Sequence, residues 1–372
     1  MANYASKVRQ DIMRWRQAGL VDAATAATLL SDVEANERRA LSFGAILAMM
    51  AALLLGAAIL IFVAANWEAI PRLARVLLLF AVILAGYVGG ALLKLRGQAA
   101  AGEALWIVAA AAFGGSIALV GQMYHLPGDE TSALVTWGIG TAVAAVALRS
   151  NPLTVAAVGI ADAWLVLKVA YGFDMYRSFA FPHLFVVMAA ALYGISFWTR
   201  SQQARHLIML SLILYAVLLA LDHDTLAVAI GLAVVSAAAF AAAVAAPEPV
   251  ERIVGLGGRL PLHGFIGFLT ALVIIQFDRA AGSGFGLAAA VALAGIAAAI
   301  VFGGRESRGL RWLAYLGFAF ELLVIYGVMM ETMLGTAGFF LAAALILGLL
   351  AFVIIRVERR MAGVATQAGA VQ

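Results

Sequence analysis

The stretch LARVLLLFAVILAGYVGGALL, residues 73–93, decides the fold class. It carries a single charge, Arg75, close to its start. An α-helix rises about 1.5 Å per residue, so about 20 apolar residues cross a hydrocarbon core about 30 Å thick. Gly86 and Gly90 lie four residues apart, on one side of such a helix, and favour close packing against a second helix. The stretch therefore predicts a membrane-spanning helix.

The same pattern recurs along the chain. Of its 372 residues, 65% are hydrophobic and 12% are charged, and the mean hydropathy is +1.02. Soluble domains are about half apolar and about a quarter charged. We therefore expect an all-α polytopic bundle of ten to twelve spans, with twelve preferred. The candidate spans are 43–65, 73–93, 103–122, 133–148, 153–171, 182–198, 206–221, 225–246, 262–277, 284–303, 311–330 and 337–355.

Three regions are expected from this pattern. Residues 1–40 form a polar cytoplasmic segment, residues 41–360 the membrane bundle, and residues 361–372 a short, disordered cytoplasmic tail. The first apolar run begins only near Phe43, after a polar stretch, whereas a cleavable signal peptide has its apolar core close to the start. The first span is therefore expected to remain as an uncleaved anchor.

The first 40 residues indicate an amphipathic helical hairpin. Apolar side chains recur at helical spacing over 4–18 and again over 23–36. Gly19 is suited to end the first helix, and Asp22 to cap the second. Such a hairpin can lie against the spans or the lipid headgroups, or it can dock a protein partner, and both interpretations stay open.

Basic residues mark alternate connections between the spans. If the N-terminus is cytoplasmic, the inner connections and the tail are rich in Lys and Arg, as the positive-inside rule requires. They carry Lys94, Arg96, Arg149, Arg200, Arg205, Arg252, Arg259, Arg305, Arg308, Arg311, Arg356, Arg359 and Arg360, whereas the outer side carries Arg72, Arg177 and Arg279. Both termini are therefore predicted to be cytoplasmic. These short, scattered connections form no basic patch for nucleic acid, despite the net charge of +4.

Polar residues gather at two places on the predicted outer face. The first outer connection contains Asn66, Trp67, Glu68 and Arg72, and the end of the third span contains Gln122, Tyr124 and His125. Trp67 fits an aromatic belt at the membrane interface. Asn66 is explained if this connection is simply a capped, hydrogen-bonded turn, because asparagine is common in turns. Alternatively, the two places meet as one outer-face cluster.

These two places and the turn of the N-terminal hairpin resemble a known family. Asn66-Trp67 after a first span rich in glycine and alanine, Gly121-Gln122-Met123-Tyr124, and the turn with Trp15, Gly19 and Leu20 are similar to bacterial multi-pass proteins of domain-of-unknown-function family 2157. The resemblance covers roughly residues 1–150. It implies a bacterial cytoplasmic (inner) membrane location and this topology, and it implies no reaction.

Two acids lie within predicted spans. Asp162 is near the middle of 153–171 and Glu321 near the middle of 311–330. A charge at a helix centre costs about 2.5–3.5 kcal/mol on insertion scales, so such groups face protein or water. They indicate either a proton or cation relay or protonated carboxyls bonded to neighbouring helices. Lys168 is six residues from Asp162, which places it on another face of the helix, where it can snorkel to the interface.

No catalytic or cofactor motif is evident, so an enzyme is the least supported class. The chain has no cysteine, and His125, His183 and His223 show no metal-ligand spacing, so neither metal nor cofactor is expected. Besides the lipid bilayer, the partners left are a small solute or ion, or a protein at residues 1–40. The sequence thus favours a carrier or channel for a small solute or ion. The alternative is a scaffold or regulatory component that docks a partner through its hairpin.

Overall fold

The computed structural model describes residues 2–39, 71–125, 129–174, 181–222, 225–280, 284–304 and 307–329, with isolated helical positions between 47 and 65 and between 338 and 348. None of these residues belongs to a strand. The predicted spans 43–65 and 337–355 lie largely outside the described residues, and the tail 361–372 lies wholly outside them. The chain divides into two units, Met1–Ile160 and Ala161–Gln372, and each is described by itself.

The first unit opens with the predicted helical hairpin, α1 (Ala2–Gln17) and α2 (Ala23–Arg39). Gly19 has a φ of +73°, a left-handed conformation that glycine adopts without strain, and it reverses the chain between the helices. Ile12 and Ala26 are buried where the two helices meet. The hairpin and its glycine turn are therefore as predicted.

Asp22 caps α2, as its position before the helix predicts. Its carboxylate accepts a hydrogen bond from the backbone N–H of Thr25 at 3.3 Å. Hydrogen bonding to Thr25 favours the charged form and holds the pKa of Asp22 below its ordinary value of 3.8. One of the free N–H groups at the start of α2 is thereby satisfied.

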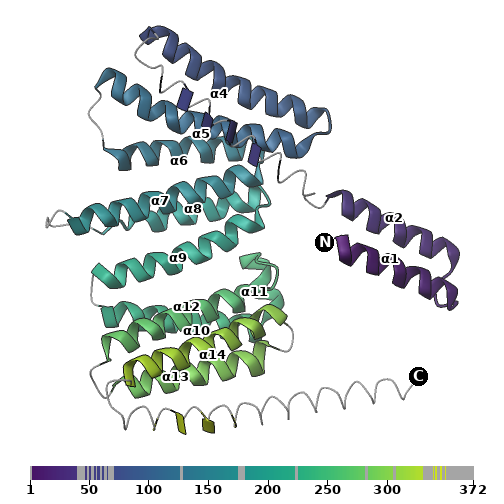
Figure 1. The fold of residues 1–372 in the computed structure, drawn as a ribbon, viewed down its shortest axis with the longest axis vertical. Coiled ribbons are helices and arrows are strands. Elements are labelled where there is room, and N and C mark those ends of the chain that lie inside the picture. Colours follow the sequence, from purple (N-terminus) through teal and green to yellow (C-terminus); the bar gives the residue numbers. More distant parts are fainter. Residues whose placement is uncertain are drawn as a thin grey trace. The chain divides into compact units, whose positions relative to one another are not determined.

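The next two helices, α4 (Arg72–Leu95) and α5 (Ala99–Tyr124), form an antiparallel hairpin in the first unit (Figure 1). At Gly86 and Gly90 of α4, the two helices approach too closely to leave room for a side chain. A Cβ added to Gly90 would lie 2.5 Å from the Trp106 ring, and one added to Gly86 would also clash with α5. The close helix approach predicted from Gly86 and Gly90 is confirmed.

The first unit is completed by α6 (Glu130–Leu148) and the first part of α7 (Asn151–Asp174). Asp129 caps α6 by accepting the N–H of Ser132 at 2.7 Å. A small core of buried residues joins α5, α6 and α7: Trp106, Ala110, Ala145 and Leu153.

In the part of the second unit that the structure describes continuously, the rest of α7 is followed by seven helical segments. These are α8 (Leu184–Trp198), α9 (Gln202–Asp222), α10 (Thr225–Ala245), α11 (Pro247–Val254), α12 (Leu260–Asp278), α13 (Gly284–Ala298), which continues as the π-helical turn η2 (Ala299–Gly303), and α14 (Arg308–Met329). Its core is an aromatic and aliphatic cluster of Phe265, Ile296, Ala299, Leu310, Ala314 and Phe318. This cluster packs α12, α13 and α14 together.

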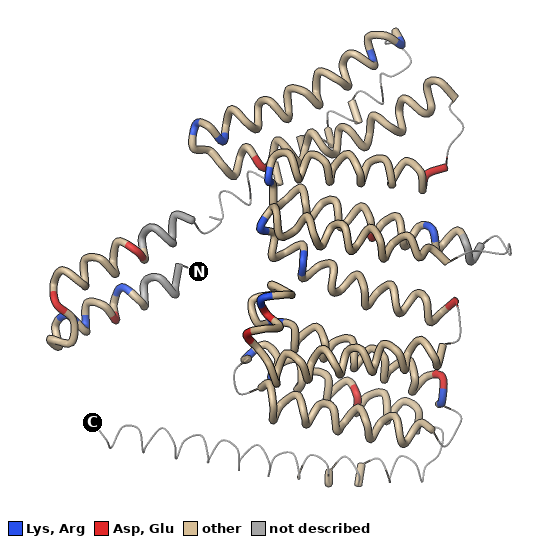
Figure 2. Tube along the Cα trace, turned by 180° about the vertical axis from the view of Figure 1, so that it is seen from behind, with Lys and Arg blue, Asp and Glu red and all other residues tan. Residues whose placement is uncertain are grey.

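Within the described part of the chain, nine helices are long and apolar enough to cross a membrane. The shorter apolar helix α8 coincides with the predicted span 182–198, so ten of the twelve predicted spans have a helical counterpart. Figure 2 shows that Lys and Arg gather mainly at the ends of these helices. The all-α, multi-pass architecture predicted from the sequence is therefore confirmed.

Candidate functional site

Glu321 is the most deeply buried acid among the described residues, with 2% of its surface exposed. It lies 13 residues after the start of α14, and its neighbours Phe320 and Leu322 are apolar. The backbone of a helix interior is occupied by its own hydrogen bonds, so it offers the carboxyl group no partner. Any partner must come from another helix.

That partner is Gln276 of α12, which the sequence reasoning missed. Its Nε2 donates a hydrogen bond to Glu321 Oε1 at 2.9 Å, and the glutamine is fully buried. No cation forms an ion pair with Glu321 among the residues described. Within the described part of the chain, the acid is thus held by a neutral amide alone.

The amide oxygen of Gln276 has no hydrogen-bond partner among the described residues. A buried, unsatisfied polar atom costs about 1–3 kcal/mol, so a donor is expected beside it. An ionised carboxylate has no proton to offer, whereas a protonated carboxyl group has one. The geometry therefore suits a carboxyl–amide pair in which Glu321 carries its proton.

Asp162 of α7 occupies a similar site in the second unit. It is half-buried, and Ser211 of α9 donates to its Oδ2 at 2.9 Å. Its Oδ1 is buried without a partner in the part of the chain that the structure describes, so Lys168 does not bind it. Ser211 is a second neutral partner that the sequence reasoning missed.

Two acceptors compete for the single hydroxyl proton of Ser211. Its oxygen also lies 2.9 Å from the carbonyl oxygen of Leu207, one turn earlier in α9. A hydroxyl carries one proton, so it cannot fully bond both acceptors. A protonated Asp162 would donate to Ser211, which would leave the serine proton for Leu207.

The predicted outer-face cluster is only partly described. Asn66, Trp67 and Glu68 lie outside the described residues. Arg72 begins α4, while Gln122, Tyr124 and His125 are exposed at the end of α5, so the antiparallel hairpin places them at one end. His125 ends α5 in a left-handed conformation, with a φ of 48°. Their meeting with Asn66 stays a prediction.

A charged cluster in the first unit was not singled out from the sequence. Lys94 of α4 forms an ion pair with Glu103 of α5 at 2.6 Å, and Ser150, before α7, donates to the other carboxylate oxygen. The Lys94 ammonium also lies 4.2 Å from the centre of the Trp106 ring. Because the Lys94 ammonium and the Ser150 hydroxyl bond both oxygens of the Glu103 carboxylate, this cluster is suited to holding the ends of the helices together.

A second cluster that the sequence reasoning did not single out pairs two histidines in the second unit. The rings of His206 of α9 and His263 of α12 stack with their centres 5.1 Å apart. His263 Nδ1 lies 2.9 Å from the Arg259 carbonyl oxygen, which identifies that nitrogen as the protonated one. The described residues contain no group of three or more acids or histidines placed to hold a metal ion.

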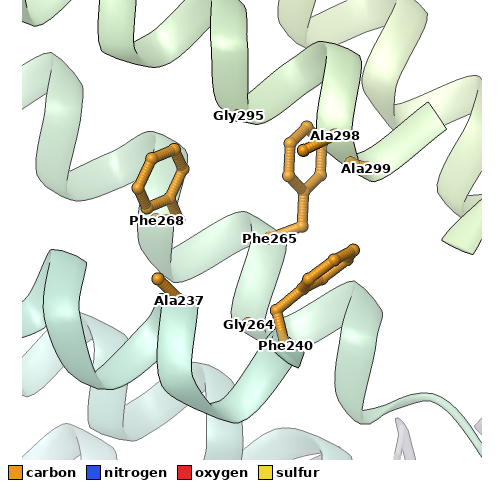
Figure 3. Close-up of a pocket in the computed structure, with 8 residues that line it drawn as sticks. All are labelled: Ala237, Phe240, Gly264, Phe265, Phe268, Gly295, Ala298 and Ala299. Carbon is orange, nitrogen blue, oxygen red and sulfur yellow. The ribbon is translucent and has the colours of Figure 1, made fainter. Parts of the chain in front are cut away.

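The second unit also contains an apolar cavity of about 110 Å³ (Figure 3). Its walls come from α10, α12, α13 and η2, and Phe240, Phe265 and Phe268 are its largest side chains. The other described residues of its wall are alanines and glycines, so none of the described wall residues offers a side-chain ligand to an ion. Neither Asp162 nor Glu321 lines it.

Residues 13–154 match a protein-family model described as "Predicted membrane protein (DUF2157)". This confirms, for that segment, the family that the motifs at residues 66–67 and 121–124 resemble. The segment includes the Lys94–Glu103–Ser150 cluster and excludes Asp162 and Glu321. No curated protein and no solved structure matches the chain.

Proposed function

We propose that this multi-pass membrane protein is a carrier or channel for a small solute or ion, and that its activity depends on a proton held by Glu321. The supporting observation is the buried Glu321–Gln276 pair, in which the acid bonds a neutral amide whose oxygen has no hydrogen-bond partner among the described residues. Releasing that proton would leave a charge that the pair cannot stabilise. The bundle must then rearrange or admit water or a cation, which couples proton binding to conformation.

Asp162 and the outer-face cluster extend this proposal. The bond between Asp162 and Ser211 provides a second neutral pair on α7 and α9, where a proton or cation can be exchanged. Arg72, Gln122, Tyr124 and His125, with Asn66, Trp67 and Glu68, would form the outer entrance. We place the protein in the bacterial cytoplasmic membrane with both termini in the cytoplasm.

The direct test uses the proton as the probe. The full chain is reconstituted in vesicles that contain a pH-sensitive dye, and an imposed membrane potential drives protons inward. We expect the wild-type protein to acidify the lumen and Glu321→Gln to abolish this flux, because an amide cannot release a proton. Glu130→Gln is the matched control, since Glu130 is an exposed carboxylate at the start of α6. Equal fluxes for wild type and Glu321→Gln would contradict the proposal.

A scaffold function is favoured by one different observation. The hairpin exposes apolar side chains, among them Trp15 at 38% and Leu20 at 74%. With no native cysteine, Leu20→Cys can carry a single polarity-sensitive dye. If the hairpin lies on lipid, brominated phospholipids in pure protein–lipid discs will quench the dye. If lipid leaves the dye unchanged, the apolar face is available for a protein partner.

A further inference from the structure

A second cavity in the second unit, of about 330 Å³, lies where α12 and α14 begin and α10 ends. Its wall includes Glu251 of α11, Arg259 and Ser307, which precede α12 and α14, and apolar residues such as Leu260 and Phe302. It thus combines opposite charges, a hydroxyl and an apolar wall at the end of membrane-length helices. If these helices cross a bilayer, their ends lie at the depth of the lipid headgroups.

Hydrogen bonds hold the wall of this cavity in place. The Glu251 carboxylate accepts the N–H groups of Gly257 at 2.5 Å and Gly258 at 2.8 Å. Both glycines have a positive φ, which lets their N–H groups converge on one carboxylate. Arg205 of α9 donates to the Gly255 carbonyl oxygen at 2.7 Å, which fastens the same loop to the bundle. The charges are therefore preorganised.

Arg259 supplies an available cation. Its guanidinium forms no ion pair with the described residues, and its side chain is exposed. Ser307 Oγ accepts the N–H of Leu310 at 3.2 Å, which leaves the serine proton to donate. The N-termini of α12 and α14 add their positive dipole ends. These donors suit a phosphate group.

The carboxylate limits which phosphate compound fits. The Glu251 carboxylate accepts backbone N–H groups from one side of the cavity, and it would repel a headgroup that is only anionic. A headgroup with a phosphate and a primary ammonium matches both charges. Leu260 and Phe302, which is 64% exposed, provide the apolar surface on which acyl chains pack.

We propose that this cavity binds a zwitterionic phospholipid of the phosphoethanolamine type, with its phosphate beside Arg259 and Ser307 and its ammonium beside Glu251. Basic pockets between membrane helices are known to bind lipid headgroups. The added carboxylate is what selects the zwitterion. This proposal is independent of proton movement at Glu321, so either can fail alone.

The test measures lipid retained by the delipidated full chain, by native mass spectrometry, after titration with phosphatidylethanolamine, phosphatidylcholine or phosphatidylglycerol. We expect phosphatidylethanolamine to bind most tightly, because a quaternary ammonium has no N–H for Glu251 and a glycerol headgroup has no positive charge. Arg259→Gln should weaken its binding about tenfold to a hundredfold, the range for losing a charge-assisted hydrogen bond.

Arg252→Gln is the matched control. Arg252 is also basic and exposed, lies on α11, and does not line the cavity. Glu251→Gln should remove the preference for phosphatidylethanolamine over phosphatidylglycerol, and a thermal melt without lipid checks that this variant remains folded. Equal binding by Arg259→Gln and Arg252→Gln would overturn the site. Binding of phosphatidylglycerol as tightly as phosphatidylethanolamine in the wild type would overturn its zwitterion selectivity.

Discussion

At the residue scale, Glu321 and Gln276 are bonded only to each other among the described side chains. Replacing one partner leaves the other buried and unsatisfied, whereas replacing both with apolar groups removes the polar atoms together. The pair therefore contributes to stability through mutual satisfaction, independently of any role in proton movement.

The first prediction is a double-mutant cycle on this pair. Glu321→Leu should lower the free energy of unfolding by about 1–3 kcal/mol, because it strands the Gln276 amide. Gln276→Leu/Glu321→Leu should lose less than the sum of the single changes, with a coupling energy of about 0.5–3 kcal/mol. Denaturant titration in micelles measures all four proteins.

Gln122→Leu serves as the control for removing a polar side chain, since Gln122 is exposed at the end of α5. It should leave the free energy of unfolding nearly unchanged. Strict additivity of the two changes in the cycle would show that Gln276 and Glu321 do not stabilise one another.

The sequence identified the acids but not their partners. Glu321 and Asp162 are conspicuous because a charge interrupts an apolar run. Gln276 and Ser211 are neutral residues of a kind common in membrane helices, so their types give little signal. Their significance depends on which helices are neighbours, α12 beside α14 and α7 beside α9, and spacing along one chain does not determine that.

At the scale of helical elements, the contact between α4 and α5 depends on the absence of side chains. A Cβ added to Gly90 would lie 2.5 Å from the Trp106 ring and 2.7 Å from the carbonyl oxygen of Gly102. The indole is itself fixed, because Trp106 Nε1 donates to the Tyr87 carbonyl oxygen at 3.0 Å. Neither neighbour can move without breaking another contact.

The second prediction is that Gly90→Ala destabilises the protein by about 1–3 kcal/mol, the usual cost of overpacking. Gly121→Ala, on the same hairpin, is the matched control, because its added Cβ meets no atom within 4 Å other than its chain neighbours and the backbone of its own helix. Thermal unfolding in micelles should show a lower midpoint for Gly90→Ala alone. A similar loss in both variants would indicate a general effect of replacing glycine instead of this contact.

Element boundaries were largely predictable, and the exceptions have local causes. The predicted span 73–93 corresponds to α4 at Arg72–Leu95, because both ends are marked by charge. The helix α6 begins three residues before its predicted start, since Asp129 caps it ahead of the apolar run. The helix α11 was missed because eight residues with mixed charges resemble a loop, and nothing in Ala299–Gly303 indicates a π-helical turn.

At the scale of the whole chain, connections predicted to be cytoplasmic meet one another within each unit. In the first unit, the α4–α5 connection meets the α6–α7 connection. They are joined by the ion pair of Lys94 with Glu103 and by the hydrogen bond from Ser150 to the same carboxylate. In the second unit, Arg205, near the start of α9, contacts the loop after α11. Successive antiparallel spans bring alternate connections to one end, so these contacts support the up-and-down topology inferred from charge.

The last prediction concerns which side of the membrane these connections face. Since the native chain has no cysteine, a single introduced cysteine gives an unambiguous label. Arg252→Cys, on exposed α11, should react with a membrane-impermeant maleimide only when the cytoplasmic side is open. Glu130→Cys, at the exposed start of α6, should react in intact cells. The physical reason is that connections rich in Lys and Arg, such as those on the Arg252 side, are retained in the cytoplasm during insertion. Labelling of Arg252→Cys in intact cells would show that the orientation is the opposite of the one predicted. Labelling of both variants from the same side would refute the alternation of the spans between them.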